Sequence, residues 1–459
     1  MIFAGLLAGY ATLLCGGFGV TLFILRGRAR INLAECCCLS WVFGTGMVSL
    51  LLWVLGTFCS GSLLVAVVTA GGVGVGLIGA GMIGRSGAKL FLPIPRNPLE
   101  WILLGILMTQ IGIMFWIAMN RTLGWDGLVM WESKARFAFL SHNVLPAHYY
   151  NSGRGLTHPE YPLGIPLTEL WLYIWMGEAH QLWLKTLFPV FYAVGVVQLA
   201  IISARLTARR WVGGLAAVLF FFVPHETVGG GSATIGYVDF PLSILYLTVV
   251  GYLLLALKDN SGRSFLVYLV SLALLPWFKR EGAILWLIAA LAGAAFIFMR
   301  RKHRLWLLAL LPGAFVVLGW SIYLRAIHAD IPHEFVPVTF ANLMDNAGRF
   351  IPIWQALLSD ATNQQAWGLF WLLAVIATAS LFGRFRQMDC AILLWSVLIP
   401  VLAYSSIYIF SAAPDYVVHI KLSLPRLLMQ VVPALWIAIA WAFARPWGRA
   451  ENRAHAQRP

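Results

Sequence analysis

Residues 99–119, LEWILLGILMTQIGIMFWIAM, form an apolar run with one charged side chain, Glu100. A helix needs about 20 consecutive apolar residues to cross a bilayer, so this run predicts a transmembrane helix. Comparable runs recur along the chain. They are continuous rather than alternating between apolar and polar residues, which favours helices over a β-barrel. The sequence therefore predicts an all-α membrane protein.

The composition of the whole chain agrees with this prediction. The 459 residues are 60% hydrophobic and 11% charged, whereas soluble proteins carry about 25% charged residues. The mean hydropathy is +0.81. The apolar runs predict about thirteen transmembrane helices, near residues 2–25, 39–57, 62–83, 99–119, 183–204, 211–225, 236–256, 264–278, 282–299, 305–326, 366–383, 388–411 and 427–444.

The net charge of +14 comes largely from short basic clusters between the apolar runs. Such clusters are typical of cytoplasmic loops and argue against nucleic acid as a partner. They predict an outer N-terminus and a cytoplasmic C-terminus, in what we expect to be a bacterial cytoplasmic membrane. Residues 1–444 are predicted to form one polytopic domain, and residues 445–459 a short basic cytoplasmic tail.

This topology places two long loops on the outer side. The first covers residues 120–182 and is the predicted catalytic loop. Within it, residues 128–140 have an amphipathic pattern and predict a helix on the membrane surface. Residues 164–181 are apolar but short, which predicts a helix lying in the outer interface. The second loop, residues 327–364, is long enough to be a lid, although a passive connector explains it equally well.

The glycine-rich segment at residues 71–84, GGVGVGLIGAGMIG, contains the pattern GxGxxG. A dinucleotide site would need a strand before it and a helix after it. Here the pattern lies within a predicted membrane helix, so close packing between helices explains it better. The histidines and cysteines do not have the spacing of zinc motifs. No cofactor is predicted with certainty, and a divalent cation held by carboxylates stays open.

The polar residues of the predicted outer side gather in four patches. They are GWDG with WESKAR at residues 124–136, HPEYP at 158–162, GYVDFP at 236–241 and KREG at 279–282. Each patch has a simpler explanation. Asp126 and Asp239 would suit helix caps, and an ion pair would stabilise the KREG turn. Because charges at membrane depth are costly, such residues are nevertheless functional candidates.

The order of these patches resembles that of the GT-C-type membrane glycosyltransferases, which use polyprenyl-phosphate sugars. These enzymes include protein O-mannosyltransferases and the lipid A aminoarabinose and galacturonic acid transferases. The matching segments are GWDGLVMWESKARF, HPEYPLGIPL, GYVDFP, FKREG and the late HIKLSLPRLLMQVVP. The chain departs from the family in two places. Asp126 is followed by Gly127 rather than by a second acid, and a DxD motif is missing, so a protein acceptor and a metal requirement do not follow.

The resemblance implies a GT-C-like helical bundle with outer interfacial helices and an inverting sugar transfer to a lipid, glycan or protein acceptor. Such a reaction needs one carboxylate base. Asp126 is the first candidate, and Glu132 and Glu160 are the alternatives. Cations should face the departing phosphate. The candidates for contacts with the donor phosphate or the substrate are Lys279, Arg280, Lys421, Arg426, His158, Tyr161, Asp239 and Glu281.

Three other classes of membrane protein stay open from the sequence. A secondary transporter or flippase would carry the same lipid-linked substrates, although its ionisable groups usually lie on broken helices near the bilayer midplane. A polymerase or ligase of surface polysaccharide would share those substrates. A structural membrane subunit would tolerate replacement of the outer carboxylates.

Overall fold

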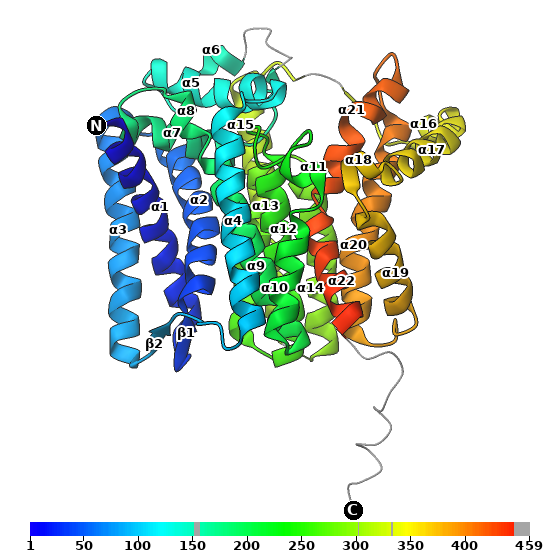
Figure 1. The fold of residues 1–459 in the computed structure, drawn as a ribbon. Helices are drawn as coiled ribbons and strands as arrows, with labels where there is room; N and C mark the ends of the chain where they lie inside the picture. The colour runs from blue at the N-terminus through cyan, green and yellow to red at the C-terminus, as the bar shows by residue number, and fades with distance from the viewer. Residues whose placement is uncertain (151–156, 302, 332–333, 445–459) are drawn as a thin grey trace, which may run out of the picture.

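The computed structural model describes residues 1–150, 157–301, 303–331 and 334–444. Within these residues the chain is a bundle of roughly parallel and antiparallel helices (Figure 1). The prediction of an all-α, multi-pass membrane protein is confirmed at this level. The predicted tail at 445–459 lies outside the described residues.

Nine described segments are long and apolar enough to cross a membrane. Each is one helix, or two consecutive ones. They are α1 (Ile2–Leu25), α2 (Leu33–Gly56), α3 (Gly61–Ser86), α4 (Pro98–Asn120), α8 (Gln181–Leu184) with α9 (Leu187–Thr207), α12 (Asp239–Asp259), α14 (Gly282–Met299), η3 (Arg304–Leu310) with α15 (Pro312–Ala326), and α20 (Met388–Ser406) with η5 (Ile407–Phe410).

The four remaining predicted spans are also helical but are short or bent. Three are shorter helices, α10 (Arg210–Phe220), α13 (Gly262–Phe278) and α19 (Phe370–Phe382). The fourth is the pair α21 (Tyr416–Met429) and α22 (Val432–Ala444), bent by 50°. At 1.5 Å per residue, α10 is about 17 Å long, well short of a bilayer core of about 30 Å. Of the thirteen predicted spans, nine among the described residues are long enough to cross a membrane, or ten if the bent pair is counted as one span.

The remaining described elements are short, and most join the long helices at one end of the bundle (Figure 1). They are η1 (Gly127–Glu132), α5 (Ser133–Leu140), α6 (Ala147–Tyr150), α7 (Gly164–Met176), α11 (Pro224–Thr227), α16 (Phe340–Asp345), η4 (Ala347–Arg349), α17 (Phe350–Ala361) and α18 (Gln364–Trp367). We call this end the cavity end, because a large cavity lies among these elements.

The opposite end holds two short parallel strands, β1 (Arg30–Asn32) and β2 (Lys89–Phe91) (Figure 1). We call it the basic end, because the basic clusters near these strands lie there. The beginning of α1 and the end of α22 lie at opposite ends of the bundle. The separation of the polar loops from the basic clusters agrees with the predicted topology, and the outward direction of the cavity end stays a prediction.

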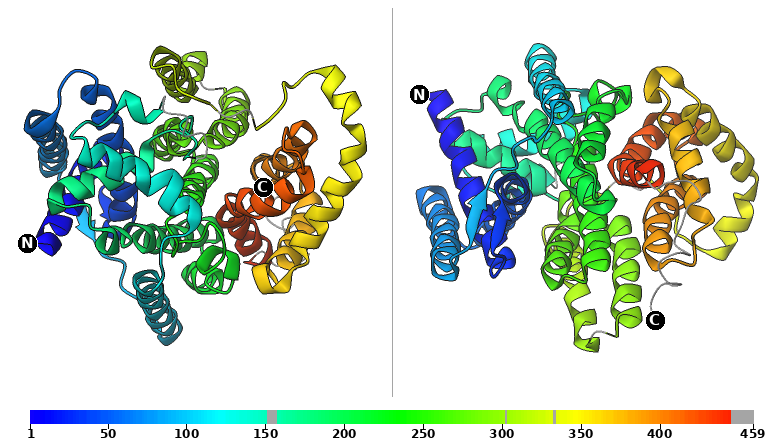
Figure 2. Two further views of the ribbon diagram at one scale, coloured as in Figure 1. Left: turned by 90° about the horizontal axis from the view of Figure 1, so that it is seen from above. Right: turned by 60° about the horizontal axis from the view of Figure 1, so that its bottom comes forward.

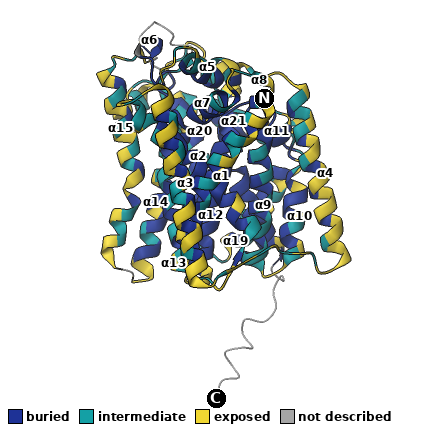
Figure 3. Ribbon diagram, turned by 90° about the vertical axis from the view of Figure 1, so that its left-hand side faces the viewer, coloured by how far each residue is buried: buried dark blue, intermediate teal, exposed yellow. Residues whose placement is uncertain are grey.

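Helix α12 is the core of the bundle. Every residue of its apolar window is buried, and it packs against α9, α13 and α22. Helices α1–α3 lie on one side of the central helices, and α19–α22 lie on the other (Figure 2). By contrast, one face of α4 and one face of α15 are exposed and apolar (Figure 3). Lipid is the natural contact for those faces in a membrane protein.

Small residues bring α1, α2 and α3 into close contact. A Cβ atom on Gly17 would lie 1.8 Å from the carbonyl oxygen of Ser40, and one on Gly79 would lie 2.6 Å from the Cα atom of Gly19. Such contacts exclude any larger side chain, as small-residue helix packing requires. This packing was predicted for the segment 71–84. Gly74, in the same segment, meets nothing within 4 Å and so plays no part in it.

We predict that Gly17→Val destabilises the protein by about 3 kcal/mol, because the added methyl groups force α1 away from α2. The control is Gly74→Val, which introduces the same side chain where there is open space. Thermal unfolding of the purified protein in detergent would measure both. Equal melting temperatures for the two variants would contradict the assigned packing.

Two helices that were predicted to lie on the membrane surface pack against other parts of the protein instead. Helix α7, expected in the membrane interface, is packed against α1, α2 and α5 and is largely buried by protein. Residues 128–140 form η1 and α5, but Trp131 and Lys134 are buried there. Most apolar side chains of α7 are covered by other helices, whereas the 128–140 segment is buried only in part, with Leu128 and Leu140 exposed.

Candidate functional site

The predicted site residues meet at a cavity of about 1210 Å³ at the cavity end of the bundle. All of them line it except Glu132 and Asp239. Its walls come from residues 125–130 and 158–162, the 225–237 segment, the turn between α13 and α14, α15, Ile331 with residues 334–338, residues 404–408 and α21. Segments that are far apart in sequence therefore contribute to a single hollow, as the order of the patches suggested.

The two glycines on either side of Asp126 allow the chain to approach the 235–237 segment closely. The Gly124 N–H donates to the carbonyl of Ile235 over 2.8 Å. A Cβ atom on Gly127 would lie 2.5 Å from that same oxygen. The Asp126 N–H donates to the Tyr237 hydroxyl over 3.1 Å. The GWDG and GYVDFP patches are thereby held together, and the position of the Asp126 backbone is fixed.

The Asp126 carboxylate forms an ion pair with Arg426. Asp126 directly precedes η1, but its side chain makes no capping hydrogen bond, so the helix-cap explanation is not met. The Arg426 guanidinium also lies 5.4 Å from the centre of the Tyr237 ring. Its Nε atom is buried without a hydrogen-bond partner among the described residues. One donor of this arginine is therefore not used by the described residues.

A buried ionic network lies beside this pair. The Lys279 ammonium contacts Asp239 at 2.8 Å and Glu281 at 2.9 Å, and Gln430 donates to Asp239 over 2.8 Å. Burial acts to lower the pKa of Lys279, but the two carboxylates outweigh it and hold the pKa above its ordinary value. Lys279 therefore stays charged. The predicted ion pair within the KREG turn is present, and Asp239 extends it.

The HPEYP turn forms another part of the wall. His158 Nδ1 lies 3.0 Å from Glu160 Oε1, and Arg280 lies 3.7 Å from the same carboxylate oxygen. The Trp320 indole donates to the Glu160 carbonyl over 2.8 Å. The ring of Tyr161 lies 5.6 Å from the Lys279 ammonium. Lys421 is an exposed residue of the wall, so its charge faces the opening rather than the core.

Glu132 lies apart from the cavity, and the structure does not bring it to the other candidates. Its carboxylate accepts hydrogen bonds from Arg136 and from the Tyr173 hydroxyl. It is 1% exposed. These contacts join η1 and α5 to α7, so the environment of Glu132 is that of a structural carboxylate.

The sequence did not single out several residues of the cavity. Tyr237, which belongs to the GYVDFP patch, lines the cavity. Gln430 does not line it but contacts Asp239 beside it, and it follows Arg426 by four residues, the spacing of one helix face. His225 lines the cavity and stacks on Trp367 at 4.7 Å. Burial lowers the pKa of His225 to about 4, so it is neutral at pH 7. Glu334 comes from the predicted lid, where no local pattern marked it.

The second loop contributes to the cavity only through its first part. Ile331 and residues 334–338 supply wall side chains. Two backbone hydrogen bonds join the 334–338 stretch to residues 410–412: the Val336 N–H donates to the Phe410 carbonyl, and the Ala412 N–H donates to the Glu334 carbonyl. Helix α17 packs beside α20 and α21 instead. A lid function for 327–364 stays a prediction.

Residues that line the cavity carry several buried polar atoms that have no hydrogen-bond partner among the described residues. They are Glu160 Oε2, Glu281 Oε2, His225 Nε2 and Arg426 Nε. Buried polar groups are usually paired, so unpaired ones indicate a bound ion, water or ligand. The cavity is thus equipped for a polar ligand next to a partly apolar wall.

Comparisons with protein-family models, with curated protein sequences and with solved structures gave no match.

Proposed function

We propose that this protein is an integral membrane glycosyltransferase that moves a sugar from a polyprenyl-phosphate donor to an acceptor at the cavity end. Two kinds of evidence support the proposal. The order of the sequence patches resembles that of GT-C enzymes, and the cavity joins those patches. The observation that carries most weight is the Asp126–Arg426 pair, since it puts a carboxylate and a phosphate-binding cation side by side.

In this proposal Arg426 binds the donor phosphate. Its planar guanidinium suits phosphate oxygens, and its Nε donor is unpaired. Lys421 and Arg280 line the same cavity and are more exposed than Arg426. They add positive charge where the lipid phosphate would develop negative charge. Lys279 is already paired with Asp239 and Glu281, so its contribution to the site is to hold these two carboxylates in place.

In the proposed transfer, the donor phosphate and the Asp126 carboxylate compete for the Arg426 guanidinium. When the donor phosphate takes up the guanidinium, the Asp126 carboxylate is released to accept a proton. An acceptor hydroxyl or amine then attacks the anomeric carbon, its proton passes to Asp126, and the carbon–oxygen bond to the phosphate breaks. The bonding electrons leave with the lipid phosphate, and the configuration at the anomeric carbon inverts.

The direct test reconstitutes the purified protein in liposomes with a panel of polyprenyl-phosphate sugars carrying a labelled sugar. We expect release of polyprenyl phosphate and the appearance of label in an acceptor added as lipid, glycan or peptide. Turnover of no donor in the panel, although the protein is folded and binds the lipid phosphate, would argue against the transferase.

The bend between α21 and α22 favours a second candidate, a carrier of the same lipid-linked substrates. Discontinuous helices hold the substrate sites of many transporters, and Arg426 and Gln430 lie next to this bend. The same liposomes distinguish the two functions. A carrier would move the labelled lipid between leaflets and leave its sugar–phosphate bond intact.

We predict that Arg426→Lys weakens binding of polyprenyl phosphate about tenfold, because lysine keeps the charge but loses the planar pair of donors. Arg136→Lys is the matched control, since Arg136 also pairs with a carboxylate, that of Glu132, but does not line the cavity. Native mass spectrometry or a fluorescent-lipid binding assay would report both affinities. Equal affinities for the two variants would remove Arg426 from the donor site.

A further inference from the structure

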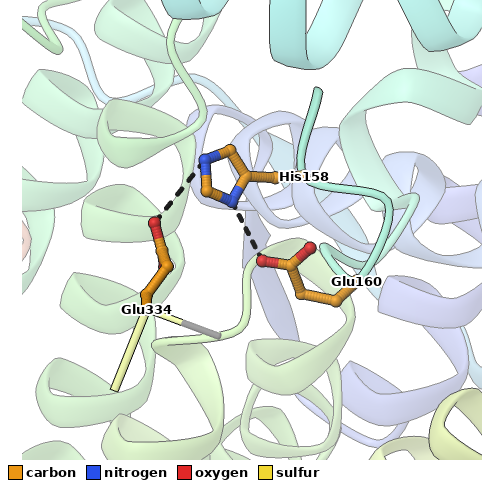
Figure 4. A group of neighbouring side chains, drawn as sticks. All are labelled: His158, Glu160 and Glu334. Atoms are coloured by element: carbon orange, nitrogen blue, oxygen red, sulfur yellow. Dashed lines mark hydrogen bonds and ion pairs between the residues drawn. The ribbon is translucent and has the colours of Figure 1, made fainter. Parts of the chain in front are cut away.

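His158, Glu160 and Glu334 form a compact group at the cavity wall (Figure 4). One potential ligand atom from each lies within 4.8 Å of the others. His158 Nδ1 is 3.0 Å from Glu160, and Nε2 is 3.6 Å from Glu334. The imidazole therefore lies between two carboxylates that belong to different loops.

The group has one ligand position that its own contacts do not use. Glu160 Oε2 is buried and has no hydrogen-bond partner among the described residues, and the Glu160 side chain is 5% exposed. Arg280 approaches the other oxygen at 3.7 Å, beyond hydrogen-bond distance. Glu160 Oε2, beside a histidine and a second carboxylate, therefore lacks the hydrogen-bond donor or cation that a buried carboxylate oxygen needs.

The backbone of His158 agrees with a specialised position. Its φ angle is +47°, in the left-handed region that non-glycine residues rarely adopt. Strain of this kind concentrates at functional sites. The turn is also held from outside the group, because the Lys134 ammonium donates to the His158 carbonyl over 2.7 Å. The imidazole is thereby presented to both glutamates.

We propose that His158, Glu160 and Glu334 bind one divalent transition-metal ion of the zinc or manganese type. A histidine nitrogen with two carboxylates is a ligand set for these ions rather than for Mg²⁺, which prefers oxygen ligands and keeps several waters. Three protein ligands leave a position open to the cavity, as at catalytic sites. Bonds of about 2.1 Å in tetrahedral geometry separate ligands by roughly 3.4 Å. Because Glu160 and Glu334 now contact opposite ring nitrogens of His158, binding one ion requires a side chain to turn so that one nitrogen and both carboxylates face the same point.

The ion would join two loops of the cavity wall. His158 and Glu160 belong to the HPEYP turn, and Glu334 belongs to the segment that hydrogen-bonds to residues 410–412. Metal binding would therefore fix residues 334–338 against the turn. This inference does not rest on glycosyl transfer, and its test requires no sugar donor.

The experiment uses the full-length protein without a histidine tag, stripped with a chelator and then dialysed against Zn²⁺, Mn²⁺ or Mg²⁺. We expect about one Zn²⁺ or Mn²⁺ per chain by elemental mass spectrometry, a higher melting temperature with that ion, and no retention of Mg²⁺. Glu334→Gln should weaken the affinity roughly a hundredfold or more. Glu178→Gln is the control, because Glu178 pairs with His180 at 3.8 Å outside the cavity.

Two results would overturn the site. One is a folded wild-type protein that retains no Zn²⁺ or Mn²⁺ after dialysis. The other is unchanged stoichiometry and affinity in Glu334→Gln. If that variant is unstable, His158→Gln provides a second test, since glutamine keeps a polar side chain but removes the nitrogen ligand. Retention of the ion by His158→Gln would equally contradict the proposal.

Discussion

Replacing Asp126 by asparagine is expected to lower the rate of sugar transfer by about 10²–10⁴-fold, the usual contribution of a general base. Asparagine keeps the size of the side chain and an acceptor oxygen for Arg426. It removes the group that accepts a proton. The GWDG backbone contacts with residues 235–237 do not depend on the carboxylate, so the variant should fold. Initial rates with a labelled polyprenyl-phosphate sugar would measure the effect.

Donor binding provides the internal control for this variant. Asp126→Asn should bind polyprenyl phosphate at least as well as the wild type, because Arg426 is no longer held by a carboxylate. Glu132→Gln is the external control, since Glu132 lies outside the cavity. Its transfer rate per folded molecule should change little. Wild-type transfer by Asp126→Asn, or an equal loss in both variants, would reject Asp126 as the base.

Replacing Lys279 by methionine is expected to destabilise the protein by about 3–5 kcal/mol. Lys279 and Asp239 are 2% and 1% exposed, and removing one partner of a buried pair leaves the other charge without compensation. Thermal unfolding in detergent would show the loss. Lys421→Met is the matched control, because Lys421 is exposed and pairs with no carboxylate in the described ion pairs.

A second substitution separates loss of the ion pair from loss of packing. In Lys279→Met with Asp239→Asn, the fully buried Asp239 charge is removed together with its partner, and asparagine can still accept from Gln430. Glu281 still loses its contact with Lys279, but its side chain is 17% exposed, so its charge is partly solvated. The double variant should recover most of the lost stability, as the coupling between contacting residues requires. If the double variant is less stable than Lys279→Met, the buried pair does not account for the effect.

The helices of this protein were predictable from the sequence because their signal is local. Each of the thirteen predicted segments contains a helix, since an apolar run identifies a span without knowledge of its neighbours. The glycine packing of α1 and α3 was likewise visible in residues 71–84. The number of spans was less predictable, because α10 and α19 are apolar helices that are shorter than a bilayer is thick.

The pairings within the site were harder to predict from the sequence, because tertiary structure creates them. Asp126 and Arg426 were both candidates, but nothing in either segment identifies the other as its partner. Glu132 resembles Asp126 in sequence context, yet its side chain points toward Arg136 and Tyr173. Glu334 lies in a loop without a distinctive pattern. The burial of α7 was missed because apolar composition serves contact with lipid and with protein equally well.

The distance in sequence between Asp126 and Arg426 has a consequence for biosynthesis. The two residues are 300 positions apart, and at about 5–20 residues per second the ribosome needs roughly 15–60 s to reach the second after the first. During that interval Asp239 can already meet Lys279, but Asp126 has no arginine. The cavity is therefore completed only when the last helices insert, and a chain interrupted before α21 enters the membrane without a finished site.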